Sequence, residues 1–430
     1  MMQNLKQIIV KKRPGLAYHI FAVKEMACET GLRQRPINVL ISPAHYFLDD
    51  SLHGSEYIWI ASILKGIISQ GGFYLHIITG AVKSFKVERG SCEIYEIVPS
   101  TKPEQGIAQR LLFTIKKTVK SKLLTRRCDF RIIHHMLPFW VGVTFDLDFV
   151  LKSRKRKYIL GPMQSPHSDA EADSLANSLD RFLYKVFIKV SSYLSSRTIR
   201  NADKIVAINT NTKELLIGRG VDSNRIEIIT PGIDTGKFQY VPFESKDSEH
   251  IVLLAVGYLV ERKGMELVIK AIGEVARNHD NFELRIIGDG PEIQNLKDLT
   301  KNLGLEKVVR FYGPIPHAEI NKQYEEAHVF VSMSRAESWG QVYLEAMASG
   351  LPVVTTENVG SREIVKDGVF GYLVRQEDYT MLAERVIHLM NNKLLLADFG
   401  RKAREEAEET YDWEKVIVPK YINLYESLIV

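Results

Sequence analysis

The order of hydrophobic segments along this chain is the feature that most constrains its fold. Short runs rich in β-branched residues, such as Ile37–Ser42 and Ile251–Gly257, alternate with longer segments whose apolar residues recur at helical spacing. This alternation is typical of parallel sheets in which each strand is followed by a helix, so we predict an α/β protein. The other predicted strands are Tyr74–Thr79, Cys92–Val98, Phe130–His134, Lys157–Leu160, Lys204–Ile208, Ile226–Thr230, Glu283–Gly288, Val308–Tyr312, Val329–Met333 and Pro352–Thr356.

The chain is long enough for two domains of this kind, since it has 430 residues and one domain usually holds ~100–200. The polar, aperiodic segment Lys237–Glu249 predicts a linker. We predict an N-terminal extension over 1–36, a first domain over 37–240, a second over 250–412 and a C-terminal helix over 413–430 that packs back toward the first. When doubly wound domains face each other, the loops after their strands meet at a shared crevice.

Composition and cysteine usage exclude several classes of protein. Apolar residues make up 45% of the chain and charged residues 25%, as is ordinary for a soluble globular protein, and no apolar stretch reaches the ~18 residues of a membrane-spanning helix. Residues 1–36 are too interrupted for a secretory signal. Cys28, Cys92 and Cys128 lack CxxC spacing, which indicates a reducing compartment and no zinc site. We expect the protein in the cytoplasm or at the inner face of the membrane.

Positive charge gathers in the first half of the chain. Residues 1–240 hold 35 Lys and Arg against 21 Asp and Glu, whereas the remainder holds 22 against 31. Within 110–131, basic residues including Lys116, Lys117 and Lys120 alternate with apolar residues at helical spacing. Such a helix either packs on its own domain with a solvated basic face or lies on an anionic membrane. No interleaving of aromatic and basic residues favours nucleic acid. The apolar residues are Leu111, Leu112, Ile115, Val119 and Leu123.

Two glutamates eight residues apart, Glu337 and Glu345, mark the stretch that says most about function. A helix that begins near Trp339 would carry Glu345 on its wall and place Glu337 beside its N-terminus. The first N–H groups of a helix lack internal partners and its dipole favours an anion there. Gly350 predicts the end of the helix. The arrangement suits a ligand with many hydroxyls and a phosphate, although one solvated glutamate and one cap would explain the spacing alone.

The full string Ser334–Thr355, SRAESWGQVYLEAMASGLPVVT, resembles the signature of retaining glycosyltransferase family 4. The resemblance implies a GT-B fold, in which two Rossmann-like domains with doubly wound parallel sheets face each other across a cleft. It also implies transfer of a sugar, with retention, from a nucleotide-diphosphate donor to a glycan or lipid-linked acceptor, and no metal or other cofactor. The resemblance implies that Glu337 and the backbone that follows it hold the sugar, and that Glu345 accepts hydrogen bonds from the ribose. The backbone residues are Ser338, Trp339, Gly340 and Gln341.

Loops after other predicted strands extend the resemblance. The segment from Gly257 to Gly264, GYLVERKG, is similar to the family's loop in which Arg262 and Lys263 hold the donor diphosphate. A glycine such as Gly257 lets backbone approach a ligand closely. Ile315 belongs to a segment that resembles the one bordering the nucleotide base, so the side chains there do not indicate which base is bound.

The first domain matches the family less closely. Gly54, in the string HGSE, resembles part of the Gly-Gly-x-Glu loop that meets the diphosphate and the acceptor. One of two consecutive histidines at a strand end, His134 and His135, corresponds to the family's histidine beside the donor sugar; we favour His135, with a structural histidine as the alternative. The loop 161–167 replaces the family's glycines from Gln164 onward, so the acceptor cannot be inferred by analogy.

The candidate site therefore consists of two groups of residues, and two other functions stay open. The string Asp146-Leu147-Asp148 has the DxD pattern of metal-binding glycosyltransferases of another fold, but we assign it no metal. A non-catalytic GT-B scaffold would bind the nucleotide without turnover, and a nucleotide-sugar epimerase would convert a donor without an acceptor. The candidate catalytic residues are His135, Arg262, Lys263 and Glu337, and the candidate substrate-binding residues are Gly54, Gly257, Ile315, Ser338, Trp339, Gly340, Gln341 and Glu345.

Overall fold

The computed structural model describes residues 36–43, 47–49, 55–87, 90–97, 107–136, 139–140, 145–164, 178–246, 249–316 and 319–429. Residues 37–430 form one compact unit, and residues 1–36 are assigned to a separate one. Three sequence predictions lie outside the described residues: the structure of the N-terminal extension, the role of Gly54, and the loop beyond Gln164.

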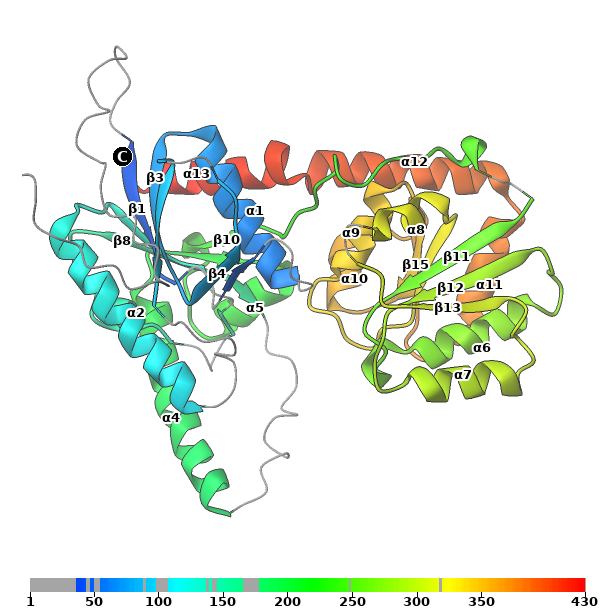
Figure 1. The fold of residues 1–430 in the computed structure, drawn as a ribbon, viewed down its shortest axis with the longest axis horizontal. Helices are drawn as coiled ribbons and strands as arrows, with labels where there is room; N and C mark the ends of the chain where they lie inside the picture. Colours follow the sequence, from blue (N-terminus) through cyan, green and yellow to red (C-terminus); the bar gives the residue numbers. More distant parts are fainter. Residues whose placement is uncertain are drawn as a thin grey trace, which may run out of the picture. The chain divides into compact units, whose positions relative to one another are not determined.

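The first domain is built on a parallel sheet whose strands lie in the order β10-β9-β8-β6-β1-β3-β5, with β7 paired to β8 (Figure 1). Strands β2 and β4 form a separate small sheet. The strands are β1 (Ile37–Ile41), β2 (Phe47–Asp49), β3 (Phe73–Thr79), β4 (Ala81–Ser84), β5 (Cys92–Glu96), β6 (Ile132–His135), β7 (Phe139–Trp140), β8 (Lys157–Gln164), β9 (Lys204–Ala207) and β10 (Ile226–Ile228). The helices are α1 (Ser55–Gln70), α2 (Ile107–Arg127), α3 (Leu147–Val150), α4 (Ser178–Asn201) and α5 (Thr210–Gly218).

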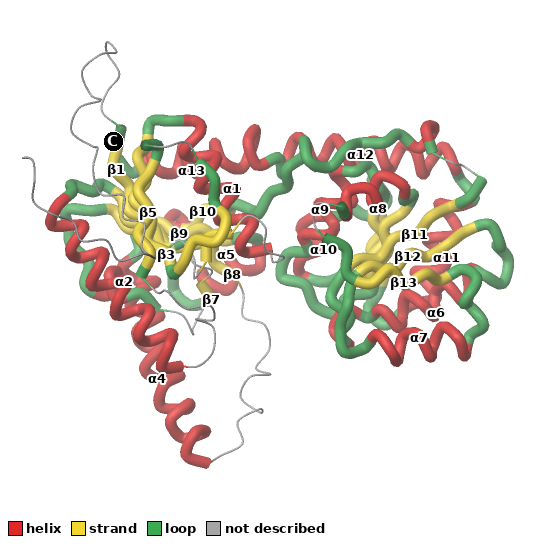
Figure 2. The backbone as a smooth tube through the Cα atoms, viewed as in Figure 1, coloured by secondary structure: helices red, strands yellow, loops and turns green. Residues whose placement is uncertain are grey.

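The second domain has a parallel sheet of its own, in the order β13-β12-β11-β14-β15-β16. Its strands are β11 (Ile251–Val256), β12 (Phe282–Ile287), β13 (Val309–Gly313), β14 (Val329–Ser332), β15 (Val353–Thr356) and β16 (Gly371–Val374). Its helices are α6 (Met265–Val275), α7 (Ile293–Asn302), α8 (Ile320–Glu326), α9 (Gln341–Ala348), α10 (Val359–Ile364), α11 (Tyr379–Met390) and α12 (Lys393–Thr410). Figure 2 shows the yellow strands of each sheet between red helices, which confirms the predicted α/β architecture.

Alternating residues of each strand face different layers of helices, as a period of two requires. In β11, Leu253 packs in the core that α6, α7 and α11 share, whereas Leu254 faces the core that includes α8 and α9. In β1, Leu40 packs with residues of α2 to α5, and Val39 with residues of α1. Because both faces are covered, the strands read as nearly continuous apolar runs in the sequence.

Each sheet begins at its middle and winds outward in both directions. The chain order therefore reverses between β1 and β6 in the first sheet and between β11 and β14 in the second. In open α/β sheets, ligands bind beyond the carboxyl ends of the strands at such a switch point. The fold thus singles out two places, the loops after β1 and β6 and the loops after β11 and β14.

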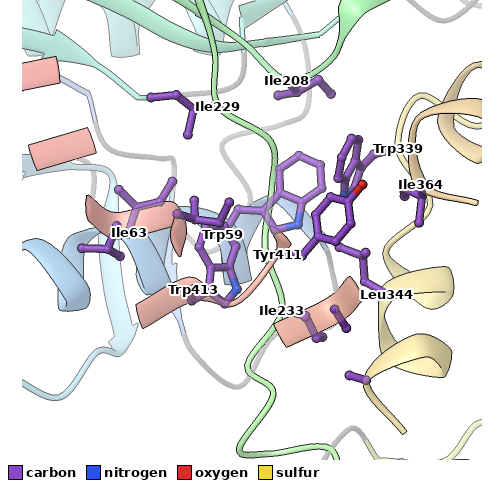
Figure 3. Packing of buried hydrophobic residues seen from close by; sticks show 14 of the residues in the cluster. Trp59, Ile63, Ile208, Ile229, Ile233, Trp339, Leu344, Ile364, Tyr411 and Trp413 are labelled. Carbon is purple, nitrogen blue, oxygen red and sulfur yellow. The ribbon is translucent and has the colours of Figure 1, made fainter. Parts of the chain in front are cut away.

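The C-terminal residues leave the second domain and pack on the first. Helix α12 contacts α9, a π-helical turn follows at Trp413–Ile417, and α13 (Val418–Ser427) then contacts α1. A Cβ atom on Gly66 of α1 would collide with Val418 of α13, so the glycine permits this close approach. The apolar cluster in Figure 3 combines residues of both domains with this crossing segment, among them Trp59, Trp339 and Tyr411.

Sequence reasoning was wrong about several elements. It missed β2, β4, β7 and β16, which are two to four residues long and too short to show a period. It ended one strand at Leu160, whereas β8 continues to Gln164 because β7 and β9 pair with its last residues. The helix of the glutamate pair, predicted to begin near Trp339, begins at Gln341, since Gly340 before it has a φ of +96°.

The orientation of α2 also differs from what the alternation of basic and apolar residues suggested. Leu112, Ile115, Val119 and Leu123, expected as the packed face in one reading, are 46–54% exposed. Lys117, expected at the surface, is 2% exposed and forms ion pairs with two aspartates. The helix therefore presents its apolar stripe outward, and Lys117 cannot belong to a surface-binding face.

Candidate functional site

The switch point of the second sheet brings together the cationic loop and the first glutamate. Lys263 ends the turn after β11, Glu337 lies in the loop after β14, and their side chains form an ion pair. The Arg262 guanidinium lies 3.9 Å from the other carboxylate oxygen of Glu337 and donates to the Ala336 carbonyl at 2.5 Å. Two cations and one carboxylate thus converge where the fold favours a ligand.

Glycines set the geometry of the cationic loop. Gly264 has a φ of +60° and joins the 3-10 turn Glu261–Lys263 to α6; a Cβ there would collide with the Met333 carbonyl. Gly288, with a φ of +134°, passes close to the Gly257 carbonyl, where any side chain would clash. Because these residues lack side chains, the ends of β11, β12 and β14 approach one another closely.

Hydrogen bonds hold the loop that carries Glu337. Thr356 and Asn358 donate to the Ser334 carbonyl at 2.6 and 3.0 Å, and the hydroxyl of Ser334 donates to Glu337 at 3.1 Å. The Gly360 N–H donates to the Glu337 carbonyl at 2.9 Å. The first turn of α10 therefore fixes the backbone of the glutamate loop.

The second glutamate lies in a buried setting on α9. Glu345 is 7% exposed and accepts a hydrogen bond of 2.7 Å from the Tyr324 hydroxyl of α8. Burial and the neighbouring Glu345 charge raise the pKa of Tyr324 well above its ordinary value, so the phenol stays a donor. Burial lowers the pKa of Lys237, while Glu345 acts in the opposite direction. Glu345 is therefore held by its own domain before any ligand binds.

The predicted sugar-holding backbone lies between the two glutamates. Gly340 is the N-cap of α9, and a Cβ on it would collide with the Tyr343 ring. The indole of Trp339 is 2% exposed and packs on Tyr411 with ring centroids 5.9 Å apart, so a ligand would meet this residue through its backbone. Ile315, after β13, lines an open hollow with Pro314, Pro316 and residues of α8.

Residues of the first domain contact this region, and sequence reasoning missed them. Asn209 caps α5 and donates through its side-chain amide to the Ser338 carbonyl at 2.8 Å. Gln341 accepts from the Trp59 indole at 2.9 Å and donates to the Gly232 carbonyl at 3.0 Å. An Asn after a strand predicts a cap, but no sequence signal indicates a contact with a residue so distant along the chain.

The two histidines at the end of β6 have different surroundings. His134 uses both ring nitrogens within the fold: Nδ1 lies 2.7 Å from the Tyr425 hydroxyl of α13 and Nε2 lies 3.1 Å from the Gly161 carbonyl. Burial lowers the pKa of His134 to about 3. His135 points to the other face of the sheet and contacts Asp146. The structure thus assigns His134 a structural place, and His135 is left as the candidate for the sugar site.

The DxD string forms a buried ionic cluster with Lys117. The Lys117 ammonium lies 2.5 Å from an Asp146 oxygen and 2.9 Å from an Asp148 oxygen. Asp146 Oδ2 is 2.5 Å from His135 Nδ1, and the Ser42 hydroxyl is 3.3 Å from Asp148. These residues follow or adjoin β1 and β6, so the cluster occupies the switch point of the first sheet. Both carboxylates of the DxD string therefore face the ammonium group of Lys117.

Comparison with known proteins agrees with this geometry. A family model described as glycosyl transferases group 1 matches residues 237–406, and one described as glycosyltransferase family 4 matches residues 68–237. Together they cover the first sheet from β3 onward and the whole second sheet with its switch point. The chain belongs to glycosyltransferase family 4. The resemblance recognised in the sequence is thereby confirmed.

Individual relatives match over part of their length. A D-inositol 3-phosphate glycosyltransferase of Corynebacterium urealyticum is 30% identical over 250 residues, which cover 54% of this chain and 58% of that protein. The chain spans about a quarter to three-fifths of the length of four curated relatives that it matches.

Solved structures share the GT-B fold across nearly the whole chain. Sucrose-phosphate synthase from Thermosynechococcus elongatus has a TM-score of 0.67 at 19% identity, over 92% of this chain and 99% of that one. HepE of Anabaena in complex with UDP has a TM-score of 0.64 at 17% identity, over 91% and 100%. The predicted GT-B architecture is confirmed. Among the described residues, no helix is long and apolar enough to cross a bilayer.

Proposed function

We propose that this chain is a retaining glycosyltransferase that moves a sugar from a nucleotide-diphosphate donor to a glycan or lipid-linked acceptor in the synthesis of a surface polysaccharide or glycolipid. The observation that supports it most is the convergence of Arg262, Lys263 and Glu337 at one switch point. The known complex of HepE with UDP shows that a protein of this fold binds a nucleoside diphosphate.

In this proposal the donor diphosphate lies against Arg262 and Lys263. Fixed cations stabilise the charge that develops on the leaving diphosphate, with no need for reorganisation during the reaction. Glu337 holds the sugar hydroxyls together with the backbone from Ser338 to Gln341, and Glu345 accepts hydrogen bonds from the ribose. Because Lys263 is already paired with Glu337, its ammonium group is held in place before the donor binds.

The first experiment is a thermal-shift screen of the full chain against UDP-glucose, GDP-mannose and ADP-glucose, with EDTA present. A ligand that binds only the folded state stabilises it by about 2.7 kcal/mol at a hundred times its Kd. We expect one nucleotide to raise Tm and Lys263→Met to abolish the rise. The exposed Lys307→Met serves as the control, because it removes the same charge from the same domain. No shift with any donor would favour the scaffold alternative.

Transfer activity and stereochemistry complete the test. We expect Arg262→Ala and Glu345→Gln to lose most of the transfer activity, and NMR of the product to show the donor's anomeric configuration. Full activity in both variants would contradict the proposed site. Conversion of the donor without any acceptor would indicate an epimerase instead.

We also propose that α2 brings the first domain to an anionic membrane surface. Leu112, Ile115, Val119 and Leu123 follow one another at intervals of three and four residues, and all four are exposed. At about 100° per residue they form one narrow stripe. Basic residues lie on both sides of it, and α2 contains no acidic residue. This arrangement suits a helix lying in the interface of a bilayer with anionic lipids. The flanking basic residues are Lys116, Lys120, Lys122, Arg126 and Arg127.

Vesicle flotation tests the α2 surface. We expect binding to vesicles of phosphatidylcholine and phosphatidylserine, weaker binding to phosphatidylcholine alone, and loss of binding in Ile115→Ser/Val119→Ser and in Lys116→Gln/Lys120→Gln. Leu394→Ser is the matched control, because Leu394 is an exposed leucine (86%) in the second domain. Unchanged binding of the α2 variants would exclude this surface as the contact.

A further inference from the structure

A buried carboxylate of the first domain contacts the candidate histidine of the sugar site. Asp146 Oδ2 lies 2.5 Å from His135 Nδ1, and the side chains are 0% and 3% exposed. Asp146 is the N-cap of α3, and its backbone N–H donates to the Thr198 hydroxyl of α4 at 3.0 Å. The ring of His135 packs edge to face on Phe149, 6.3 Å between centroids. Both the carboxylate and the imidazole are therefore fixed in orientation.

The second oxygen of Asp146 is committed to two donors. Oδ1 lies 2.5 Å from the Lys117 ammonium and 2.8 Å from the backbone nitrogen of Asp148. Burial alone would raise the pKa of Asp146, but the Lys117 charge and the His135 bond outweigh it and hold the pKa well below its ordinary value. Oδ2 is thus an ionised acceptor that faces Nδ1, and a neutral imidazole must place its proton there.

We propose that Asp146, held by Lys117, is a positioning residue that fixes His135 as the tautomer with its proton on Nδ1. Nε2 then carries the lone pair and can accept a hydrogen bond from a hydroxyl of the sugar substrate. This rests on the proposed function, in which His135 lies beside the donor sugar. Of the two aspartates in the DxD string, only Asp146 contacts the histidine, so Asp146 alone has this role.

The substitution Asp146→Asn gives a sharp test, because the cluster dictates how the amide must lie. Lys117 and the Asp148 N–H are both donors, so the amide oxygen has to take the Oδ1 position. The amide NH₂ then faces His135 Nδ1 as a donor and forces the proton to Nε2. The same change in Ser-His-Asp triads leaves the geometry intact and produces the wrong tautomer.

Asp148→Asn is the matched control. Asp148 lies two residues from Asp146. Ser121 hydrogen-bonds its carboxylate, and its Oδ2 accepts from the same lysine at 2.9 Å and from the Ser42 hydroxyl at 3.3 Å. An amide oxygen can replace the oxygen that these donors share. A loss of cluster stability would therefore appear in both variants, whereas a change at His135 would appear only in Asp146→Asn.

The readout is the ¹⁵N NMR signature of the imidazole in the full chain labelled at histidine, with His135→Gln used for assignment. We expect the Nδ1–H tautomer in the wild type and in Asp148→Asn, and the Nε2–H tautomer in Asp146→Asn. The proposal is overturned if Asp146→Asn keeps Nδ1–H, or if Asp148→Asn changes the tautomer equally.

Activity gives the second readout, with UDP-glucose, GDP-mannose and ADP-glucose assayed in turn. We expect Asp146→Asn to lower kcat/KM by roughly 10- to 100-fold, as one misdirected hydrogen bond at a charged group would, and Asp148→Asn to stay near wild type. Full activity of Asp146→Asn would overturn the positioning role. If the wild type transfers no sugar, the proposed function fails, while the NMR result still decides the tautomer.

Discussion

At the scale of single residues, close contacts limit which side chains a position can hold. Gly360 sits where α10 meets the glutamate loop, and a Cβ on it would overlap the Trp339 carbonyl. Its N–H also holds the Glu337 carbonyl. Gly360 is therefore a position at which a side chain cannot fit.

Gly360→Ala should therefore destabilise the protein. Because the added methyl group meets backbone rather than a flexible side chain, we expect a loss of about 1–3 kcal/mol in the free energy of unfolding, together with weaker donor binding. Urea unfolding measures the first effect and the thermal shift the second. Gly218→Ala is the control: a Cβ there meets nothing within 4 Å, so stability should change little.

His134 links stability to pH. Its pKa is lowered to about 3 by burial, whereas an unfolded chain has a histidine pKa of about 6.5. The unfolded state then binds more protons between these values, so the stabilisation is complete above about pH 6.5 and is lost as pH falls toward 3.

We expect the wild type to lose on the order of 3 kcal/mol more than His134→Gln when pH falls from 7 to 4. Urea unfolding at both pH values measures this difference. Other groups titrate equally in the two proteins and cancel in the comparison. Parallel pH curves would show that His134 is not the buried neutral base described above.

At the scale of elements, α13 anchors the end of β6. The Tyr425 hydroxyl is 2.7 Å from His134, the neighbour of the candidate sugar-site histidine, and its ring packs edge to face on Phe73 at 5.4 Å. The C-terminal helix thereby fixes the strand end from one side while Asp146 fixes His135 from the other. Periodicity after Trp413 indicated a helix, but only the contacts show which strand it supports.

Removing one hydroxyl tests this anchor. Tyr425→Phe leaves a buried imidazole nitrogen without its donor, which costs about 1–3 kcal/mol. We expect this loss in urea unfolding with the ring packing unchanged. Tyr421→Phe provides the comparison, since Tyr421 lies on the same helix and is also buried, and its ring contacts His134 without a hydrogen bond to it. Equal losses in the two variants would argue against a specific anchor.

At the scale of the whole described molecule, a small set of polar contacts joins the two domains. Gln341 opens α9 and bonds Trp59 of α1 and the Gly232 carbonyl. Thr210 of α5 donates its N–H to Glu363 of α10 at 2.6 Å. Ser338 and Gln341 of the predicted sugar-holding backbone are thus among the residues that contact the first domain.

A double-mutant cycle measures that contact. We expect Trp59→Phe and Gln341→Ala to show a coupling energy of about 0.5–1.5 kcal/mol in unfolding, since each removes the same hydrogen bond. The single variants should also weaken donor binding in the thermal-shift assay. Strictly additive effects would mean that the two side chains do not interact in solution.

The sequence by itself determined the parallel α/β class and the positions of the longer strands. The fold class follows from local periodicity. The sequence also identified the family, because the family signature is a dense string between Ser334 and Thr355. It identified Arg262, Lys263 and Glu337 as candidates, and the structure brings all three together. Short edge strands such as β16 were not predicted, since so few residues cannot establish a period.

Tertiary structure alone decided which side chains are buried and what they touch. The alternation in α2 fitted a helix of either orientation, and only packing shows that Lys117 points inward and that the exposed apolar stripe, which includes Ile115 and Val119, points outward. His134 and His135 are adjacent, so they lie on opposite faces of one strand. Only the tertiary structure shows which partners each of them meets on its face. Partners such as Asp146, Tyr425 and Asn209 come from distant segments, and a contact between distant segments depends on the whole fold.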